Sequence, residues 1–385
     1  MYVHELAEWP GFHWNKERLA QPLVDVRHRQ GVLIGHMGAL GFNLRQEAVL
    51  QTLTTDVIKS SEIEGERLDP EQVRSSIARR LGMDVGALKA ADRDVEGVVE
   101  MMLDATRNYN QPLTAERLFG WHAALFPTRR SGMRKITVGA WRDDREGPIQ
   151  VVSGPMGKER VHFEAPAAPR VEKEMSAFLD WFNGNSDLDL VMKAGLAHLW
   201  FVSIHPFDDG NGRIARAIAD MTLARSENSP QRFYSMSAQI RQDRNAYYEI
   251  LEQTQKGDMD VTPWMEWFLG CLGRAIDGAQ TVLAAVLAKA RFWERAQRGS
   301  INDRQKLVLN RLLDGFEGKL TTTKYANLTK SSPDTALRDI TLLVEAGLLV
   351  RSSEGGRSTS YAIAPALMGE EPEKKARPQQ GKINA

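Results

Sequence analysis

Cysteine is nearly absent from this sequence: Cys271 is the only one among 385 residues. A single cysteine cannot form an internal disulfide, and metal sites built on cysteine need several such ligands. The sequence also lacks an excess of charge, with 50 basic and 50 acidic residues and a formal net charge of +0. This balance argues against a protein that coats polyanions and leaves room only for local basic patches.

Long apolar runs are also missing from the sequence. The longest, residues 194–204, is interrupted by His198 and is shorter than the roughly 20 residues that span a bilayer. The first residues carry acidic side chains where a secretory signal needs a positive start and an apolar stretch. We therefore expect a cytoplasmic protein with no membrane partner.

Apolar residues recur at helical spacing through most of the chain. Hydrophobic residues make up 42% and charged residues 26%, which is close to the average of globular proteins. The length fits two or three folded units. Spacings of three and four residues predict a mainly α protein, with helices over 46–63, 90–107, 169–183, 188–204 and 214–225.

The helical period is broken between Ile136 and Phe163. Three short pieces rich in β-branched residues, 136–142, 148–154 and 160–166, are separated by glycine and proline. Such punctuation is typical of strands joined by turns, and a β-hairpin is the simplest interpretation. Residues 147–161 are the best candidate for it.

The last hundred residues have a different pattern from the rest of the chain. Helices are expected over 303–313, 321–328 and 333–346, and two short strands with a glycine-rich turn follow them. Three helices followed by such a β-wing are typical of a winged helix-turn-helix domain. We therefore divide the chain into an N-terminal helical region (1–90), a core (91–275), a linker helix (276–300), a winged helix domain (301–365) and a disordered tail (366–385).

The most informative stretch is residues 205–216, which lie between two predicted helices. Gly210, Asn211 and Gly212 precede a helix start, where unpaired backbone N–H groups and the helix dipole attract an anion. Arg213 and Arg216 are three residues apart and therefore share one face of the first turn, from which guanidinium groups bind phosphate oxygens.

Two further side chains of this stretch suit phosphoryl-type chemistry. Asp209 offers a hard oxygen ligand for Mg²⁺, and the ion would hold two phosphates and neutralise their charge. His205 has an ordinary pKa of about 6.5 and is the natural base for an attacking hydroxyl. The pattern thus indicates a phosphate site with a base beside it.

The same stretch resembles the signature of the Fic family, His-x-Phe-x-[Asp/Glu]-Gly-Asn-Gly-Arg-x-x-Arg, at every specified position. Members typically transfer AMP from ATP to a hydroxyl group of a target protein. The resemblance implies a Fic-type helical bundle with a hairpin flap, in which a target segment pairs with the flap as an added strand. It also implies roles for seven positions: His205 as general base, Asp209 as the Mg²⁺ ligand, residues 210–212 as the anion site, and Arg213 and Arg216 as phosphate clamps.

An upstream segment, Ser60 to Gly65, resembles the inhibitory signature of these enzymes, [Ser/Thr]-x-x-x-Glu-[Gly/Asn]. Glu64 would end a helix, and Gly65 is a good residue for stopping it. The Glu64 carboxylate would then pair with Arg216 in the place of the γ-phosphate and leave ATP in an unproductive pose. The resemblance therefore implies an enzyme that is inactive by default.

The family resemblance also implies contacts outside these two motifs. Tyr248, which follows Tyr247, is similar to an aromatic residue that stacks on adenine in related members. The expected partners are ATP, a target protein with a Ser, Thr or Tyr hydroxyl group, and a second copy of the chain in a homodimer, with self-modification as a further reaction.

Two other functions stay open at the level of sequence. One is the removal of AMP from a modified target, for which Glu64 would position water in the same site. The other is a DNA-binding regulator with an accessory core, in which residues 333–346 enter the major groove. Residues 301–363 contain nine basic and seven acidic side chains, which is a weak electrostatic footprint for DNA binding.

Overall fold

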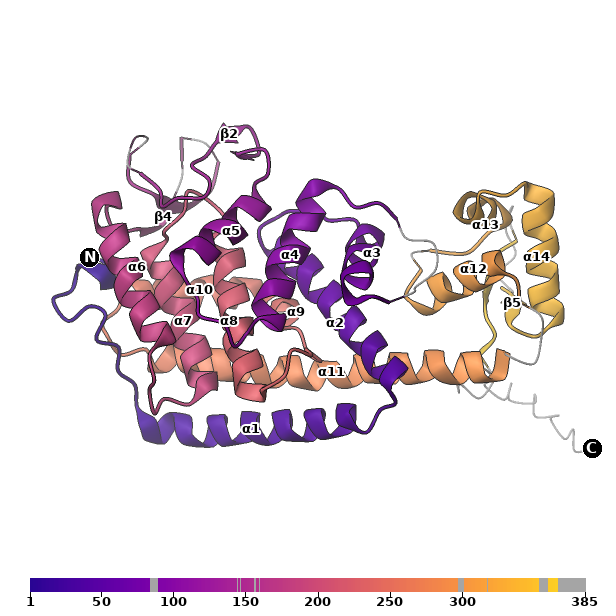
Figure 1. Cartoon of the computed structure of the whole chain (residues 1–385), viewed down its shortest axis with the longest axis horizontal. Helices are drawn as coiled ribbons and strands as arrows, with labels where there is room; N and C mark the ends of the chain where they lie inside the picture. The colour runs from indigo at the N-terminus through magenta and orange to yellow at the C-terminus, as the bar shows by residue number, and fades with distance from the viewer. Residues whose placement is uncertain are drawn as a thin grey trace, which may run out of the picture. The chain divides into compact units, whose positions relative to one another are not determined.

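The computed structural model describes the chain except for residues 84–88, 144, 146, 156, 159, 297–300, 317, 353–358 and 366–385. The protein forms two compact units, Met1–Val282 and Leu283–Ala385. The described part is mainly helical, as the sequence predicts, and its strands are short (Figure 1). The expected disordered tail and the expected glycine-rich turn lie outside the described residues.

Helices make up most of the first unit. In chain order they are η1 (Val3–Glu5), α1 (Lys16–Gly38), α2 (Phe42–Ile63), α3 (Pro70–Leu81), α4 (Arg93–Arg107), α5 (Ala115–Leu125), α6 (Ala168–Asn183), α7 (Leu190–Ile204), α8 (Asn211–Glu227), α9 (Met236–Gln242), α10 (Arg244–Gln255) and α11 (Thr262–Ala296), the last of which continues into the second unit.

Helix α7 is the buried centre of the first unit and packs against α8. Every residue of α7 after Leu190 is buried, in keeping with its nearly uniform apolar sequence. Trp264 of α11 donates a hydrogen bond from Nε1 to the Gly195 carbonyl at 2.9 Å. The residue that follows α7, His205, is therefore fixed by a helix with no freedom to shift.

The N-terminal segment packs onto this core. Trp9 and Phe12 contact Trp200 of α7, with ring centroids 6.4 Å and 5.9 Å apart. Helix α1 lies beside the first half of α11, where Arg18 binds Glu266 at 2.7 Å (Figure 1). These contacts join the first forty residues to the same unit as α7 and α8.

Two antiparallel hairpins lie between α5 and α6. Strands β1 (Arg130–Ser131) and β2 (Arg134–Lys135) form the first, and β3 (Gln150–Ser153) and β4 (Arg160–Glu164) form the second. The second hairpin overlaps the predicted hairpin at 147–161 and extends to Glu164. It has a register shift between Val151 and Val152 and is called the flap below.

The strand expected over residues 136–142 is wrong. Its backbone groups bind other partners: the Thr137 N–H donates to Asp208, and the Arg142 N–H donates to the Pro206 carbonyl at 3.0 Å. Trp141 of this piece also contacts Phe207 of the loop, with ring centroids 5.3 Å apart. Contacts with the 205–208 loop therefore take the place of a strand ladder.

Helix α11 is 35 residues long and is the longest helix among the described residues. Within the described residues, Thr262–Glu294 is long and apolar enough to cross a membrane by length and composition. Core helices of globular proteins have the same property, and Trp264, Phe268 and Leu272 of this helix are buried inside the first unit.

The second unit contains the end of α11, then α12 (Asp303–Leu313), α13 (Thr322–Thr329) and α14 (Pro333–Glu345), and the antiparallel strands β5 (Leu349–Arg351) and β6 (Tyr361–Ile363). Ser332 caps α14 and Pro333 is its first residue, which is the favoured arrangement for a helix start. A separate apolar core includes Phe292, Leu309 and Ile340. The order of helices and strands agrees with the sequence pattern.

Close packing between α4 and α5 gives a test of the fold. A Cβ atom on Gly97 would overlap the Ala124 carbonyl, so we expect Gly97→Ala to destabilise the first unit by about 2 kcal/mol. Gly120 on α5 has open space, and Gly120→Ala should be neutral or stabilising by up to about 1 kcal/mol. Urea unfolding of both variants measures the difference, and equal stabilities would contradict this packing.

Candidate functional site

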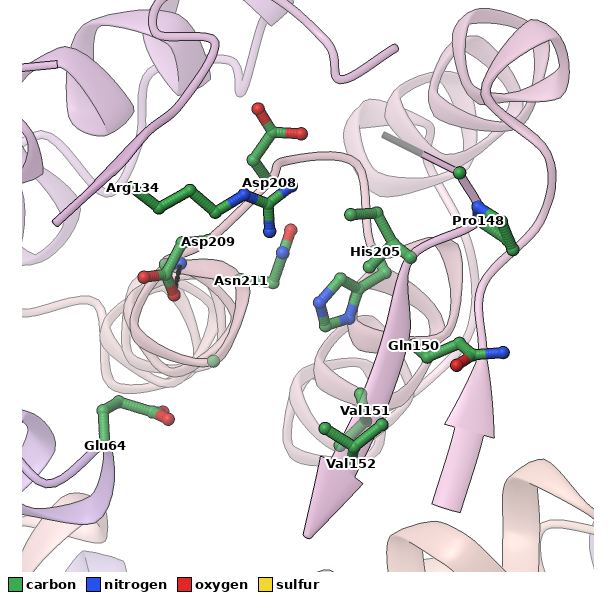
Figure 2. A pocket seen from close by; sticks show the side chains of 14 residues that line it. Glu64, Arg134, Pro148, Gln150, Val151, Val152, His205, Asp208, Asp209 and Asn211 are labelled. Atoms are coloured by element: carbon green, nitrogen blue, oxygen red, sulfur yellow. Dashed lines mark hydrogen bonds between the residues drawn. The ribbon is translucent and has the colours of Figure 1, made fainter. Parts of the chain in front are cut away.

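A cavity of about 620 Å³ opens at the junction of α7 and α8. One wall is the loop between these helices, a second is the flap, and the end of α2 contributes a single side chain (Figure 2). The lining residues are Glu64, Arg134, Gly147, Pro148, Ile149, Gln150, Val151, Val152, His205, Asp208, Asp209, Gly210, Asn211 and Gly212.

His205 ends α7 and faces this cavity. Its backbone has φ of 53°, a left-handed conformation that turns the chain sharply out of the helix. Its Nδ1 lies 3.3 Å from the Val202 carbonyl, and because a carbonyl only accepts, Nδ1 carries the proton. The free lone pair is therefore on Nε2.

The surroundings of His205 favour its neutral form. Burial, and after it the positive charge of Arg142, lower the pKa of His205 to about 4. The Arg142 Nε also donates to the His205 carbonyl at 2.7 Å, which holds both residues in place. His205 is thus a neutral base at physiological pH, although a weaker one than its ordinary pKa suggested.

The loop between His205 and α8 is braced from inside by Asn211. The Phe207 N–H donates to Asn211 Oδ1 at 3.0 Å, and Asn211 Nδ2 donates to the Phe207 carbonyl at 2.8 Å. The Phe207 ring is fully buried and stacks on His122 at 4.1 Å. The side chain of Asn211 therefore shapes the loop, and only its backbone is left for an anion.

Gly210 fills a position that other residues would strain. Its φ is 80°, and a Cβ atom there would lie 2.9 Å from Phe126. It precedes the first residue of α8, so the amides at this helix start face the cavity mouth. Residues 210–212 line the cavity, and their role as an anion site stays a prediction.

Asp209 was predicted to bind Mg²⁺, and its carboxylate lines the cavity. Oδ1 accepts from the Gly210 N–H at 2.6 Å, and Oδ2 accepts from the Ser131 hydroxyl. Among the described residues, no group of three or more His, Cys, Asp or Glu side chains is placed to hold a metal. One carboxylate fits Mg²⁺ only together with substrate phosphates and water, which is how proteins commonly hold this ion.

Glu64 reaches the same site from the end of α2. Its Oε1 accepts from Arg216 Nη2 at 2.7 Å. Arg216 also donates from Nε to the Ser60 hydroxyl and from Nη2 to the Ser60 carbonyl, both at 3.0 Å. The side chain of Arg216 is 1% exposed, so this ion pair is the main neutraliser of a buried charge.

The carboxylate of Glu64 lies directly against Gly212 at the start of α8. A Cβ atom on Gly212 would collide with Glu64 Oε1 and lie 3.2 Å from Arg216 Nη1. This Nη1 is buried and has no hydrogen-bond partner among the described residues. A buried, unpartnered guanidinium nitrogen beside backbone amides is a place where an additional anion gains strong hydrogen bonds.

Arg213 has a partner that sequence reasoning missed. Its Nη1 donates to Glu66 Oε2 at 2.7 Å, and its guanidinium lies 5.1 Å from the centroid of the Phe126 ring. Only the fold of the chain after Gly65 brings Glu66 to this place, and no motif marked it. The sequence also shows no sign of the role of Ser131, which donates to Asp209, or of Arg142, which donates to the His205 carbonyl. Both contacts join residues that are far apart in the sequence.

The structure thus brings most of the predicted residues together. His205, Asp209, residues 210–212 and Glu64 line one cavity, and Arg213 and Arg216 stand behind it with their charges paired. Ser60 holds Arg216, and Gly65 (φ 85°) ends α2. Tyr248 does not line the cavity; its hydroxyl donates to the Ile63 carbonyl at 3.4 Å, and its stacking on adenine stays a prediction.

Comparison with known proteins identifies this region. Residues 112–223 match the Fic/DOC family, and residues 2–83 match a domain of unknown function (DUF4172). The chain is 39% identical over 116 residues to protein adenylyltransferase Fic of Nematostella vectensis, and 34% identical over 105 residues to that of Drosophila willistoni. These matches cover 29% and 27% of this chain and only 25% and 20% of the two relatives.

One solved structure supports the fold, and a second covers more of the chain at a lower score. A Fic domain containing signaling protein from Bacteroides thetaiotaomicron has a TM-score of 0.50 at 20% identity, over 67% of this chain and 96% of that one. A Fic family protein from Desulfovibrio desulfuricans covers 89% of this chain at 21% identity and a TM-score of 0.49. The chain carries a Fic/DOC domain within residues 112–223, and its first unit has the Fic-type helical fold.

The role of Asn211 as an internal brace gives a prediction. Asn211→Ala leaves the buried Phe207 N–H and carbonyl unpaired, and we expect a loss of about 2 to 4 kcal/mol in the free energy of unfolding. Asn211→Asp keeps the acceptor for the Phe207 N–H and should lose less. Urea denaturation measures both, and an Ala variant as stable as the original would show that the brace is unimportant.

Proposed function

We propose that the chain is an autoinhibited protein adenylyltransferase, which transfers AMP from ATP to a hydroxyl group of a protein. The observation that carries the proposal is the single cavity that His205, Asp209 and the amides of residues 210–212 share, with the buried Arg216 beside it. A base, an anion site and cationic side chains in one cavity are the groups that phosphoryl-type transfer requires. The names of the Fic relatives support the same activity.

The reaction follows from the positions of these groups. The triphosphate of ATP binds over the start of α8, with its charge met by backbone amides and by Arg213 and Arg216. Nε2 of His205 takes the proton from the target hydroxyl, whose oxygen attacks the α-phosphorus. The bond from the α-phosphorus to the leaving oxygen breaks, pyrophosphate departs, and AMP remains on the target as a phosphodiester.

Asp209 would hold Mg²⁺ against the phosphates, where the ion offsets their negative charge. The other described groups set orientation. Arg142 and Val202 fix the imidazole, and Asn211 fixes the loop on which the phosphates rest. Positioning of this kind lowers the barrier because the attacking oxygen and the phosphorus need no further alignment.

Glu64 would inhibit this reaction by taking the place of phosphate oxygens. Its carboxylate is bound to Arg216 and covers Gly212, so a triphosphate must displace it or bind in another pose. A carboxylate next to incoming phosphates also repels them. Inhibition therefore acts on nucleotide binding and leaves the base in place.

The flap is the proposed docking strand for the target. Its residues Gln150, Val151 and Val152 line the cavity, and it forms a sheet of only two strands. An added strand would carry a hydroxyl group past His205 and be held mainly through backbone hydrogen bonds. Target choice would then depend on the few side chains next to the acceptor.

Removal of the inhibitory carboxylate is the first test of this function. Glu64→Gly should raise the incorporation of labelled AMP into protein at least about tenfold, because Arg216 becomes available to phosphate. His205→Ala in the same background should abolish incorporation, because His205 is the one imidazole among the described residues that line the cavity. Incubation with α-labelled ATP and a cell lysate, followed by mass spectrometry, reports donor and acceptor, self-modification included.

Glu62→Gln is the matched control for that experiment. Glu62 lies on the same helix but pairs with Lys59, so its loss should leave incorporation unchanged. If Glu64→Gly shows no labelled protein with ATP or any other nucleoside triphosphate, the adenylyltransferase proposal is wrong.

The low pKa of His205 predicts how the reaction responds to pH. A base works in its neutral form, so activity is kept above the pKa and lost as pH falls through it. With a pKa of about 4, the Glu64→Gly variant should keep nearly all of its activity at pH 6. A histidine of ordinary pKa would leave roughly a quarter neutral at pH 6, so a fourfold drop between pH 8 and pH 6 would contradict the burial of this base.

Removal of AMP from a modified target is the second candidate, and the position of Glu64 favours it. Glu64 and His205 line the same cavity, so a water molecule held by the carboxylate could attack the phosphodiester. Glu64→Gly would then abolish the release of AMP from an adenylylated protein, whereas it raises the addition of AMP. Assay of both directions with one variant separates the two.

The second unit is proposed to be a winged helix that binds DNA or protein. Its helices α12, α13 and α14 precede a two-stranded sheet, and Leu320 forms a β-bridge with Tyr361. Cytoplasmic location and a homodimer stay predictions from the sequence.

A further inference from the structure

The end of α2 places two carboxylates, not one, against α8. The Gly65 N–H donates to the Glu62 carbonyl at 3.1 Å, and the Glu66 N–H donates to the Ser61 carbonyl at 3.0 Å. Together with the left-handed φ of Gly65, these two bonds form a Schellman motif, which reverses the chain within two residues. Glu64 and Glu66 therefore stand on either side of Gly65 in fixed positions.

The two carboxylates match two arginines in the first two turns of α8. Glu64 binds Arg216 and Glu66 binds Arg213, each at 2.7 Å. The arginines are three residues apart on one helix face, with side chains 1% and 3% exposed. Both cationic side chains expected to hold a triphosphate are thus neutralised before any nucleotide arrives.

We propose that Glu66 is a second inhibitory residue, which occupies Arg213 while Glu64 occupies Arg216, so that a triphosphate must displace both carboxylates of one turn. This inference rests on the proposed function, because it concerns competition for the same phosphate site. Glu66 would lower the affinity for the nucleotide through Arg213, in addition to the effect of Glu64 on Arg216.

The surroundings of the Arg213–Glu66 ion pair indicate that Glu66 competes with phosphate for Arg213 and is not needed to position it. Arg213 is already held by its place in α8 and by the face of the Phe126 ring, so it does not need Glu66 to stay in position. Glu66 is 45% exposed and can swing into solvent when phosphate arrives. Partial burial raises the pKa of Glu66, and the nearby carboxylates of Asp209 and Glu64 act in the same direction against the effect of Arg213.

The test is direct binding of ATP to the full chain, measured by calorimetry with magnesium present. Glu66→Gln and Glu66→Ala remove the charge, and the alanine also removes any hydrogen bond to Arg213. We expect the Kd for ATP to fall about two- to fivefold in both variants, the effect of losing one partly exposed ion pair. Glu62→Gln, on the same helix end but paired with Lys59, should leave the Kd unchanged.

A double variant separates inhibition from positioning. In the Glu64→Gly background, Glu66→Ala should lower the Kd by a further two- to fivefold if Glu66 competes with phosphate. If Glu66 instead positions Arg213 for the nucleotide, the double variant binds ATP more weakly than Glu64→Gly, and the inference is overturned. Circular dichroism melting curves verify that each variant is folded.

The proposed function and this inference fail in different ways. If Glu64→Gly tightens ATP binding while both Glu66 variants leave it unchanged, the inference alone is overturned. If the Glu66 variants bind ATP more tightly but Glu64→Gly transfers no AMP, Glu66 competes with the nucleotide as inferred, and the proposed transfer reaction is wrong. If no variant binds ATP, both are wrong.

Discussion

The ion pair between Glu64 and Arg216 is the constraint that links helix α2 to the start of α8. A guanidinium as buried as that of Arg216 is costly without a counter-charge. In this structure a carboxylate from α2 supplies that charge, and a bound polyphosphate would supply it in the proposed active state. Because the buried Arg216 needs one anionic partner, either Glu64 of α2 or a phosphate of the proposed nucleotide can bind it. The position of α2 therefore depends on whether a nucleotide is bound.

The proposed catalytic geometry and the proposed inhibition rest on different parts of the fold. His205 is fixed by the buried helix α7 and by Arg142, and the loop after it is fixed by Asn211. None of these contacts involves α2. Displacement of Glu64 would therefore leave His205 and the loop after it in place. In the proposal, activity is controlled by whether Glu64 or a phosphate group binds Arg216.

The sequence was sufficient for the parts of the site that lie close together in the chain. Residues 205–216 form one turn between two helices, so their spacing alone indicated a helix start with anion-binding amides. The contact of Glu64 with Arg216 came from a resemblance, because no local pattern joins residues 152 positions apart. Glu66 and the low pKa of His205 depend on burial and chain reversal, which a linear pattern does not encode. The piece 136–142 was mistaken for a strand because β-branched residues also suit an irregular segment packed on a loop.

A crystal structure of the Glu64→Gly variant with ATP and magnesium tests the central claim most directly. The account predicts that the phosphates lie over the amides of residues 210–212, with Arg216 turned from the end of α2 toward a phosphate oxygen. Nucleotide bound away from the start of α8, or phosphates that make no contact with Arg216, would contradict it.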